Sequence, residues 1–383
     1  MKQQKVRKEY YENEDTGVEE ESSSILDQDL TKPYDPNKIR VDSKPYSIRQ
    51  ILDMIDQGEM DIAPDFQRRR VWQKDQQSLL IESILLRIPL PVFYCSADGE
   101  GLLQVVDGVQ RLSTIRSFRK NEFALDRLEY LQHELQGKYF SELEKSLWSR
   151  RFMSTTLAVN VIDPQTPDQV KFDIFRRLNT GGTPLNPQEI RHCISKPRTR
   201  EFLAKLCSHE TFHKVTRSKL KDHVRMVDRE VVLRHCAFRG LENISDYSHM
   251  NGIDDLLTRT VHDLGNPSKV PDRRLDELER GFSFAMEQAL QLFGEDHAFR
   301  KWYTHSDEIH PFNRALFDVW SVMLTRVNAT WLKKHTAQVV KDARRLMTDD
   351  DNFISAITSG TGKYSQIQER FTKVQKLLQA GLS

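Results

Sequence analysis

The sequence predicts an α+β protein, in which a small domain with a mixed sheet is followed by an all-helical domain. Strand signals, which are short runs rich in apolar and β-branched residues, gather between residues 91 and 162. From about residue 195 onward they fade, and apolar residues recur at helical spacing, as in 228–238, 273–293, 312–327 and 367–378. These patterns divide the chain into a tail over residues 1–44, a sheet domain over 45–195 and a helical domain over 196–383.

Residues 1–44 have the composition of a charged, disordered tail. A basic start gives way to the acidic run 19–21, and few apolar residues are present to offset the entropy of ordering the segment. We expect this tail to be flexible and unnecessary for folding. An arm that contacts a partner or nucleic acid is the alternative interpretation.

The overall composition limits the class of protein only loosely. The net charge is only +1, so nucleic-acid binding would have to come from local basic patches rather than from a global field. The sequence shows neither a signal peptide nor an apolar run long enough to cross a bilayer. Its four cysteines stand far apart, without a Cys-x-x-Cys pair. We therefore expect a soluble cytoplasmic protein with no membrane partner.

The sheet domain is predicted from a series of start and stop signals. Ser47 and Gln50 form a capping-box pattern at the start of a helix that ends near Gly58. A second helix is predicted over 75–87, followed by a hairpin of residues 91–95 and 102–106 around an Asp-Gly-Glu-Gly turn. Residues 155–162 have the β-propensity of a further strand.

The most informative stretch follows the strand predicted at 102–106. Asp107 and Gly108 interrupt the apolar run, after which Val109, Leu112 and Ile115 recur at helical spacing. We expect Asp107 near the N-cap, where its carboxylate would accept the backbone N–H of Val109 or of the next residue. Gly108 would let the chain turn without a Cβ clash.

A helix that starts in this way can bind anions. The free N–H groups and the positive end of the helix dipole favour phosphate, and Gln110, Arg111 and Thr114 would share one side of the first two turns. An ordinary capped helix after a strand would show the same pattern.

Two other segments have residues suited to phosphate or base contacts. In 66–72, three arginines stand between Phe66 and Trp72, a mixture that fits either a nucleotide or a solvated turn. In 176–191, Asn179 and the Gly181-Gly182 pair end one helix before another begins at Asn186. The exposed glycine backbone could approach a phosphate closely, or the segment could simply be a helix-loop-helix turn.

Other chemistries are rejected on the sequence. Residues 360–365 resemble a P-loop, but no Ser or Thr follows Lys363 directly and no strand is predicted before them. Cys207, His209 and His213 have turn-like spacing without the paired cysteines of structural zinc, so we assign no metal ligands. Neither a Gly-x-Ser-x-Gly elbow nor a credible His-Asn-His nuclease pattern is found.

Taken together, four segments of the chain closely resemble the GmrSD-type N-terminal domain family. They are Asp65-Phe66-Gln67-Arg68 with Val71-Trp72, then Arg87-Ile88-Pro89-Leu90-Pro91, then Asp107-Gly108-Val109-Gln110-Arg111-Leu112, and then Asn179-Thr180-Gly181-Gly182-Thr183-Pro184-Leu185-Asn186. The family is similar in fold to ParB and sulfiredoxin, and its members are found in modification-dependent restriction and other phage-defence systems. There, an Asp-Gly-Gln-Gln-Arg motif is linked to nucleotide binding and hydrolysis.

The resemblance assigns roles to individual residues when it is combined with the patterns above. Asp107 and Arg111 are the expected catalytic residues, where Arg111 neutralises phosphate and Asp107 helps to place a magnesium ion or a water. Val109 stands where the family usually has the first glutamine, so any substrate contact of that amide is absent. The expected nucleotide-binding residues are Gln67, Arg68, Trp72, Gly108, Gln110, Thr114, Asn179, Thr180, Gly181 and Gly182.

We therefore predict a nucleotide-binding module of a phage-defence or modification-dependent restriction system that acts on DNA, with hydrolysis implied by the family motif. Its expected partners are a nucleoside triphosphate, DNA and other defence proteins. A DNA nuclease or nickase is the first alternative, and a metal-dependent cut would mark it. A non-catalytic DNA-binding or scaffold subunit is the second, marked by a steep salt dependence of DNA binding without any nucleotide binding.

Overall fold

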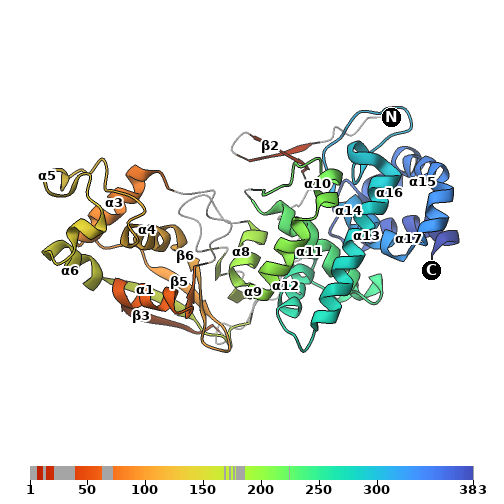
Figure 1. The fold of residues 1–383 in the computed structure, drawn as a ribbon. Helices are drawn as coiled ribbons and strands as arrows, with labels where there is room; N and C mark the ends of the chain where they lie inside the picture. Colours follow the sequence, from red (N-terminus) through yellow and green to blue (C-terminus); the bar gives the residue numbers. More distant parts are fainter. Residues whose placement is uncertain are drawn as a thin grey trace. The chain divides into compact units, whose positions relative to one another are not determined.

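The computed structural model describes residues 7–11, 14–20, 39–62, 72–167, 170–171, 174–175, 177, 186–223 and 225–382 (Figure 1). The chain divides into two compact units. One, called the sheet unit below, spans residues 33–194, and the other, the helical unit, combines residues 1–32 with 195–383. The predicted α+β class with a helical region is confirmed.

The sheet unit is built on a mixed sheet of five strands. Their order is β3-β7-β5-β6-β4, in which β7 pairs parallel with β5 and β6 pairs parallel with β4, while the other two pairings are antiparallel. The strands are β3 (Val41–Ser47), β4 (Met60–Asp61), β5 (Phe93–Ala97), β6 (Leu103–Asp107) and β7 (Thr156–Ile162).

Strand β6 is buried on both faces of the sheet. Val105 packs in the main core of the unit, whereas the next residue, Val106, packs on the other face with Ile190 of α8. The strand therefore holds its last residue, Asp107, in a fixed place. The helices of the unit are α1 (Ile48–Asp56), α3 (Lys74–Leu85), α4 (Val109–Arg119), α5 (Gln132–Leu135), the 3-10 helix η2 (Phe140–Leu143), α6 (Leu147–Ser154) and α8 (Pro187–Ile194).

Local signals in the sequence place several of these elements correctly. The capping box at the start of α1 is present, since Ser47 Oγ accepts the N–H of Gln50 at 3.3 Å and Gln50 Oε1 accepts the N–H of Ser47 at 2.8 Å. At the start of α8, Asn186 and Glu189 bond each other's backbone N–H groups in the same way. The predicted hairpin is β5 and β6, which pair antiparallel.

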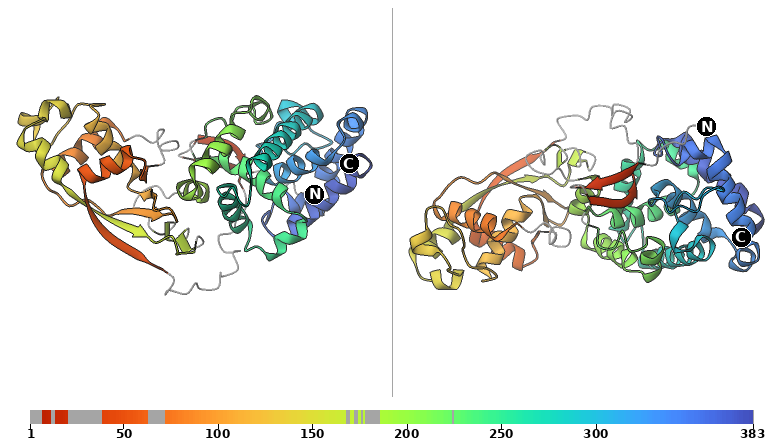
Figure 2. Two further views of the ribbon diagram at one scale, coloured as in Figure 1. Left: turned by 60° about the horizontal axis from the view of Figure 1, so that its bottom comes forward. Right: turned by 90° about the horizontal axis from the view of Figure 1, so that it is seen from above.

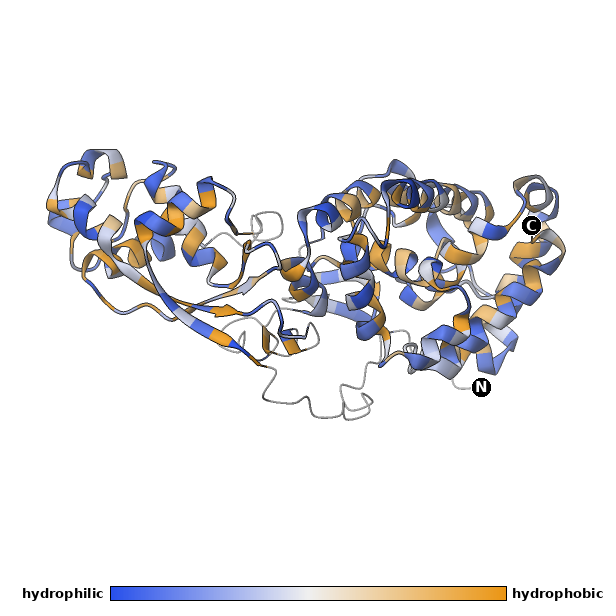
Figure 3. Cartoon of the chain, turned by 90° about the horizontal axis from the view of Figure 1, so that it is seen from below, coloured by the Kyte–Doolittle hydropathy of each residue, from blue (hydrophilic) through white to orange (hydrophobic). Residues whose placement is uncertain are grey.

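The helical unit encloses a separate, larger hydrophobic core. Figure 3 shows that helices of both units carry hydrophobic residues on one side and hydrophilic residues on the other. The helices are α9 (Pro197–Cys207), α10 (Glu210–Val215), α11 (Val227–Gly240), η3 (Ile244–His249), α12 (Ile253–Leu264), α13 (Asp272–His297), α14 (Arg314–Met323), η4 (Leu324–Arg326), α15 (Ala329–Asp349), α16 (Asp351–Ala356), α17 (Tyr364–Leu378) and η5 (Gln379–Gly381).

A buried ion-pair cluster ties three of these helices together. Asp318 of α14 is fully buried, and its two carboxylate oxygens accept hydrogen bonds from Arg234 of α11 at 2.8 and 2.9 Å. Arg370 of α17 donates to the same carboxylate at 2.9 Å. Two guanidinium groups around one carboxylate fix the relative positions of the three helices, because removing Asp318 would take this shared partner away from two buried cations.

The prediction of a disordered tail over residues 1–44 is wrong for the parts that the structure describes. Strands β1 (Lys8–Tyr11) and β2 (Glu14–Glu19) form an antiparallel hairpin, and β3 already begins at Val41. The hairpin packs against the helical unit, where Val18 forms a parallel bridge with Phe312 (Figure 2). Lys301 donates to Glu19 Oε1 at 2.5 Å, and both side chains are buried.

Candidate functional site

The turn between β6 and α4 has a backbone geometry that requires glycine. Gly108 lies in the left-handed region with φ of 94° and is the N-cap residue of α4. A Cβ atom at this position would lie 2.3 Å from Cδ1 of Phe93, the first residue of the neighbouring strand β5. Glycine is therefore required twice, once by the conformation and once by the close approach of the aromatic ring.

Asp107 does not cap the helix as the sequence predicted. The N-cap position belongs to Gly108, one residue later, and no side chain bonds to the first turn of α4 there. The Asp107 carboxylate instead accepts a hydrogen bond from Nη2 of Arg111 at 3.0 Å, across one helical turn. A strong charged donor four residues away replaces the expected backbone donor.

Arg111 is held on several sides. Its guanidinium group donates to the carbonyl oxygens of Pro91 and Val92 as well as to Asp107, and it lies over the ring of Phe93, with Cζ 4.2 Å from the ring centre. Only 12% of its side chain is exposed, against 33% for Asp107. Burial lowers the pKa of Arg111 and the Asp107 carboxylate partly offsets this, yet a guanidinium group stays charged at neutral pH.

The first turn of α4 presents unused backbone donors. The N–H of Leu112 donates to the carbonyl oxygen of Gly108 at 2.9 Å, which is the first hydrogen bond of the helical ladder. Among the described residues, the amides of Val109, Gln110 and Arg111 have no hydrogen-bond acceptor. Three N–H groups at the positive end of a helix of 11 residues are suited to an anion.

Two residues that the sequence placed near this turn are buried in the unit. Val109 is 2% exposed and belongs to the hydrophobic core, so its side chain points away from the exposed surface of the turn. Thr114 is likewise 2% exposed, whereas we expected its side chain beside Gln110 on an accessible face. Gln110, by contrast, is partly exposed.

The remaining predicted site residues are only partly covered by the structure. Gln67 and Arg68, and also Asn179, Thr180, Gly181 and Gly182, lie outside the described residues. Trp72 is described, and it packs partly buried against the core of the sheet unit. The expected role of these residues in nucleotide binding therefore stays a prediction.

Phe93 and the carbonyl oxygens of Pro91 and Val92 are site components that sequence reasoning missed. They lie about twenty residues before Arg111 in the chain and reach it only through the β5–β6 pairing. One signal was available: Pro91 ends the segment Arg87–Pro91, which was counted among the four that resemble the family.

Neither a metal cluster nor a membrane span is found within the part of the chain that the structure describes. No three His, Cys, Asp or Glu side chains come close enough together there to hold a metal ion. None of the helices in that part combines the length and apolar character needed to cross a bilayer.

The fold and this turn define a class: an α+β domain that presents a strand–glycine–helix turn with a charged pair beside it. In the comparison with protein families, residues 48–195 match the family described as "GmrSD restriction endonuclease, N-terminal domain". The match contains all four segments of the resemblance and confirms it. The chain matches no curated protein and no solved structure.

Proposed function

We propose that the sheet unit binds the phosphate groups of a nucleoside triphosphate at the Gly108 turn, as the nucleotide-binding module of a restriction system that acts on DNA. The observation that supports this is the set of three unused amides at the start of α4, which lie beside the Asp107–Arg111 pair. The family match to a restriction endonuclease domain supports the assignment to a restriction system.

Arg111 supports the site in two ways. Its contacts with Pro91, Val92 and Asp107 fix the loop before β5 next to the helix start, which keeps the amides in place. Its planar group also puts a positive charge close to the turn, where a phosphate oxygen could share the Nη2 donor with Asp107. A lysine would keep the charge but could not make these contacts together.

A magnesium ion belongs to this proposal, for an electrostatic reason. The Asp107 carboxylate is one-third exposed at the turn and would repel a phosphate group bound there. Magnesium prefers oxygen ligands and is commonly held by one or two carboxylates together with substrate phosphates. Asp107 is the residue that would contact it, and the bound ion would neutralise charge on the phosphates.

The nucleotide site is tested by ligand binding to matched variants. Nucleoside triphosphates are titrated with and without magnesium by calorimetry and thermal shift, using wild type, Arg111→Lys, Arg111→Ala and the control Arg116→Ala. Arg116 lies on the same helix but pairs with Asp56 at 3.3 Å. We expect Arg111→Ala to weaken binding roughly tenfold or more, because a charge-assisted hydrogen bond contributes about 1.5–3 kcal/mol.

Folding of the variants is checked by circular dichroism before the affinities are compared. Arg111→Lys should fold and still bind more weakly than Arg116→Ala. Equal nucleotide affinity of wild type, Arg111→Lys and Arg111→Ala would refute the phosphate site.

Hydrolysis is proposed separately from binding and has its own variant. In Asp107→Asn the amide oxygen can still accept the Arg111 hydrogen bond, so the fold should be kept while the negative charge is lost. We expect this variant to bind a triphosphate and to release phosphate far more slowly than wild type. Magnesium-dependent DNA cutting that neither Asp107→Asn nor Arg111→Ala affects would instead favour the nuclease alternative.

A further inference from the structure

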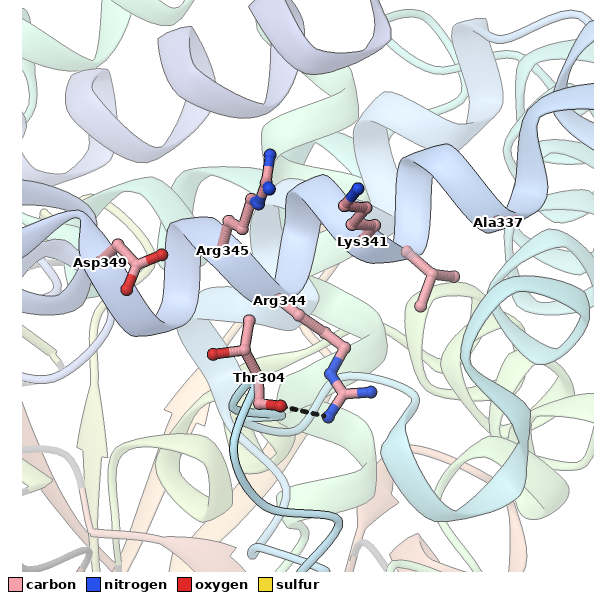
Figure 4. Close-up of a pocket in the computed structure, with 7 residues that line it drawn as sticks. Thr304, Ala337, Lys341, Arg344, Arg345 and Asp349 are labelled. Atoms are coloured by element: carbon pink, nitrogen blue, oxygen red, sulfur yellow. Dashed lines mark hydrogen bonds between the residues drawn. The ribbon is translucent and has the colours of Figure 1, made fainter.

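The helical unit has an open groove of about 700 Å³ along one of its long helices, α15 (Figure 4). One wall is the helix itself and the other includes Thr304, from the segment between α13 and α14. Three of its lining side chains are cationic and one is a carboxylate. The lining residues are Thr304, Ala337, Val340, Lys341, Arg344, Arg345 and Asp349.

Two of the cations are available to a ligand. Lys341 and Arg345 are exposed, stand one turn apart, and extend from the same side of α15 in Figure 4. Neither forms an ion pair with any other residue in the described ranges. Their charges are therefore directed to solvent rather than used within the protein.

The third cation, Arg344, is fixed and compensated. It donates to Asp307 at 3.0 Å and to the carbonyl oxygen of Tyr303 at 2.7 Å, and its Cζ lies 4.4 Å from the ring centre of Trp302. These contacts anchor the opposite wall of the groove to α15. The groove therefore keeps its shape while Lys341 and Arg345 remain free to adjust.

Helix α15 is strongly basic. Five cations (Lys333, Lys334, Lys341, Arg344, Arg345) against two carboxylates (Asp342, Asp349) give this helix a net charge of +3, whereas the whole chain carries +1. A helix of 21 residues is roughly 30 Å long. Such a length faces many phosphates of a duplex, which carries about one charge per 1.7 Å of axis.

We propose that this groove binds the phosphate backbone of duplex DNA without regard to its sequence. The unpaired cations and the open, extended shape favour a polyanion, and the choice of DNA among polyanions rests on the proposed function in a restriction system. Lysine and arginine side chains on an exposed helix face contact phosphates and position a protein on its duplex. Asp349, at the C-terminal end of the groove, opposes this binding.

The test measures binding of a fluorescent duplex of about 20 base pairs by anisotropy over a range of salt concentrations. The double variant Lys341→Gln with Arg345→Gln is compared with a control that removes the same charge outside the groove, Lys221→Gln with Arg280→Gln. Both control residues are exposed and neither has an ion pair with the described residues. The groove variant should bind roughly three- to thirtyfold more weakly, the range for two exposed charge contacts.

Two further readouts make the test specific for charge at this place. The slope of log Kd against log salt should fall by about 2 for the groove variant, since each lost phosphate contact removes about one counterion. Asp349→Asn should bind DNA more tightly than wild type, because it removes the opposing charge from the same groove.

The proposal is wrong if wild type does not bind DNA or if the groove and control variants bind equally well. A preference of tenfold or more for an RNA duplex would also overturn it, because DNA would not be the occupant. These outcomes are independent of the nucleotide site, which is tested by Arg111 and not by α15.

Discussion

At the scale of single residues, the turn leaves no room for a side chain at Gly108. We expect Gly108→Ala to destabilise the sheet unit by about 2–5 kcal/mol. Alanine would have to adopt a left-handed conformation, and its Cβ would clash with Phe93. The shift of the urea midpoint measures this. Gly99→Ala is the control, because its added Cβ meets no atom within 4 Å. A Gly108→Ala protein as stable as the Gly99→Ala protein would mean that the close approach to Phe93 is absent.

Val109 stands where the motif implied by the family resemblance has its first glutamine. Because its side chain is 2% exposed in the core, Val109→Gln would bury an amide and should cost about 1–3 kcal/mol in unfolding free energy. Thermal unfolding of this variant beside Val109→Leu separates the polar effect from the change in size. If Val109→Gln were as stable as wild type, the glutamine would have to reach solvent, and the usual motif could then be restored in this chain.

At the scale of secondary-structure elements, the N-terminal hairpin is part of the helical unit. Glu19 accepts hydrogen bonds from Lys301 at 2.5 Å and from Nδ2 of Asn313 at 2.9 Å, and it is 5% exposed. Glu19→Gln leaves the buried Lys301 charge without its partner, so we expect a loss of about 3–5 kcal/mol. Thermal unfolding tests this, with the exposed Glu20→Gln as control. Unchanged melting of Glu19→Gln would show that the hairpin contributes little to the stability of the helical unit.

Helices α11 and α14 enclose a histidine that makes the helical unit sensitive to acid. Burial lowers the pKa of His235 to about 3, with a smaller effect from Arg239, and its Nδ1 lies 3.1 Å from Ser321 Oγ. An unfolded histidine has a pKa near 6.5, so between the two values the unfolded state binds more protons, and stability falls as the pH is lowered.

From pH 7.5 to 5 this single histidine should reduce the unfolding free energy by about 2 kcal/mol, before most carboxylates titrate. Urea unfolding of wild type and His235→Gln at several pH values measures the difference in slope. Identical slopes for the two proteins would mean that His235 becomes protonated in the folded state.

At the scale of the whole molecule, sequence reasoning recovered what is encoded locally. The capping residues of α1 and α8, the β5–β6 hairpin and the long helices α11 and α13 all follow from patterns within one segment. The features that sequence reasoning missed depend on contacts between residues far apart in the chain. Hairpin β1–β2 is stabilised by Lys301 and Asn313, and Arg111 contacts carbonyl groups just before strand β5. A short, charged strand cannot show in its own sequence which residue will neutralise it.

The two units have separate hydrophobic cores, and this predicts how the whole chain unfolds. Among the residues that the structure describes, none belongs to the cores of both units, so we expect two thermal transitions in calorimetry. Gly108→Ala should lower only the transition temperature of the sheet unit, and Glu19→Gln only that of the helical unit, so the two variants assign the two transitions.

A magnesium nucleotide at about 100 times its Kd should then stabilise the sheet unit alone by about 2.7 kcal/mol, whereas duplex DNA should raise the transition temperature of the helical unit. A single transition that both ligands raise equally would show that the units unfold cooperatively, and a nucleotide that shifts only the helical unit would place its site away from Gly108.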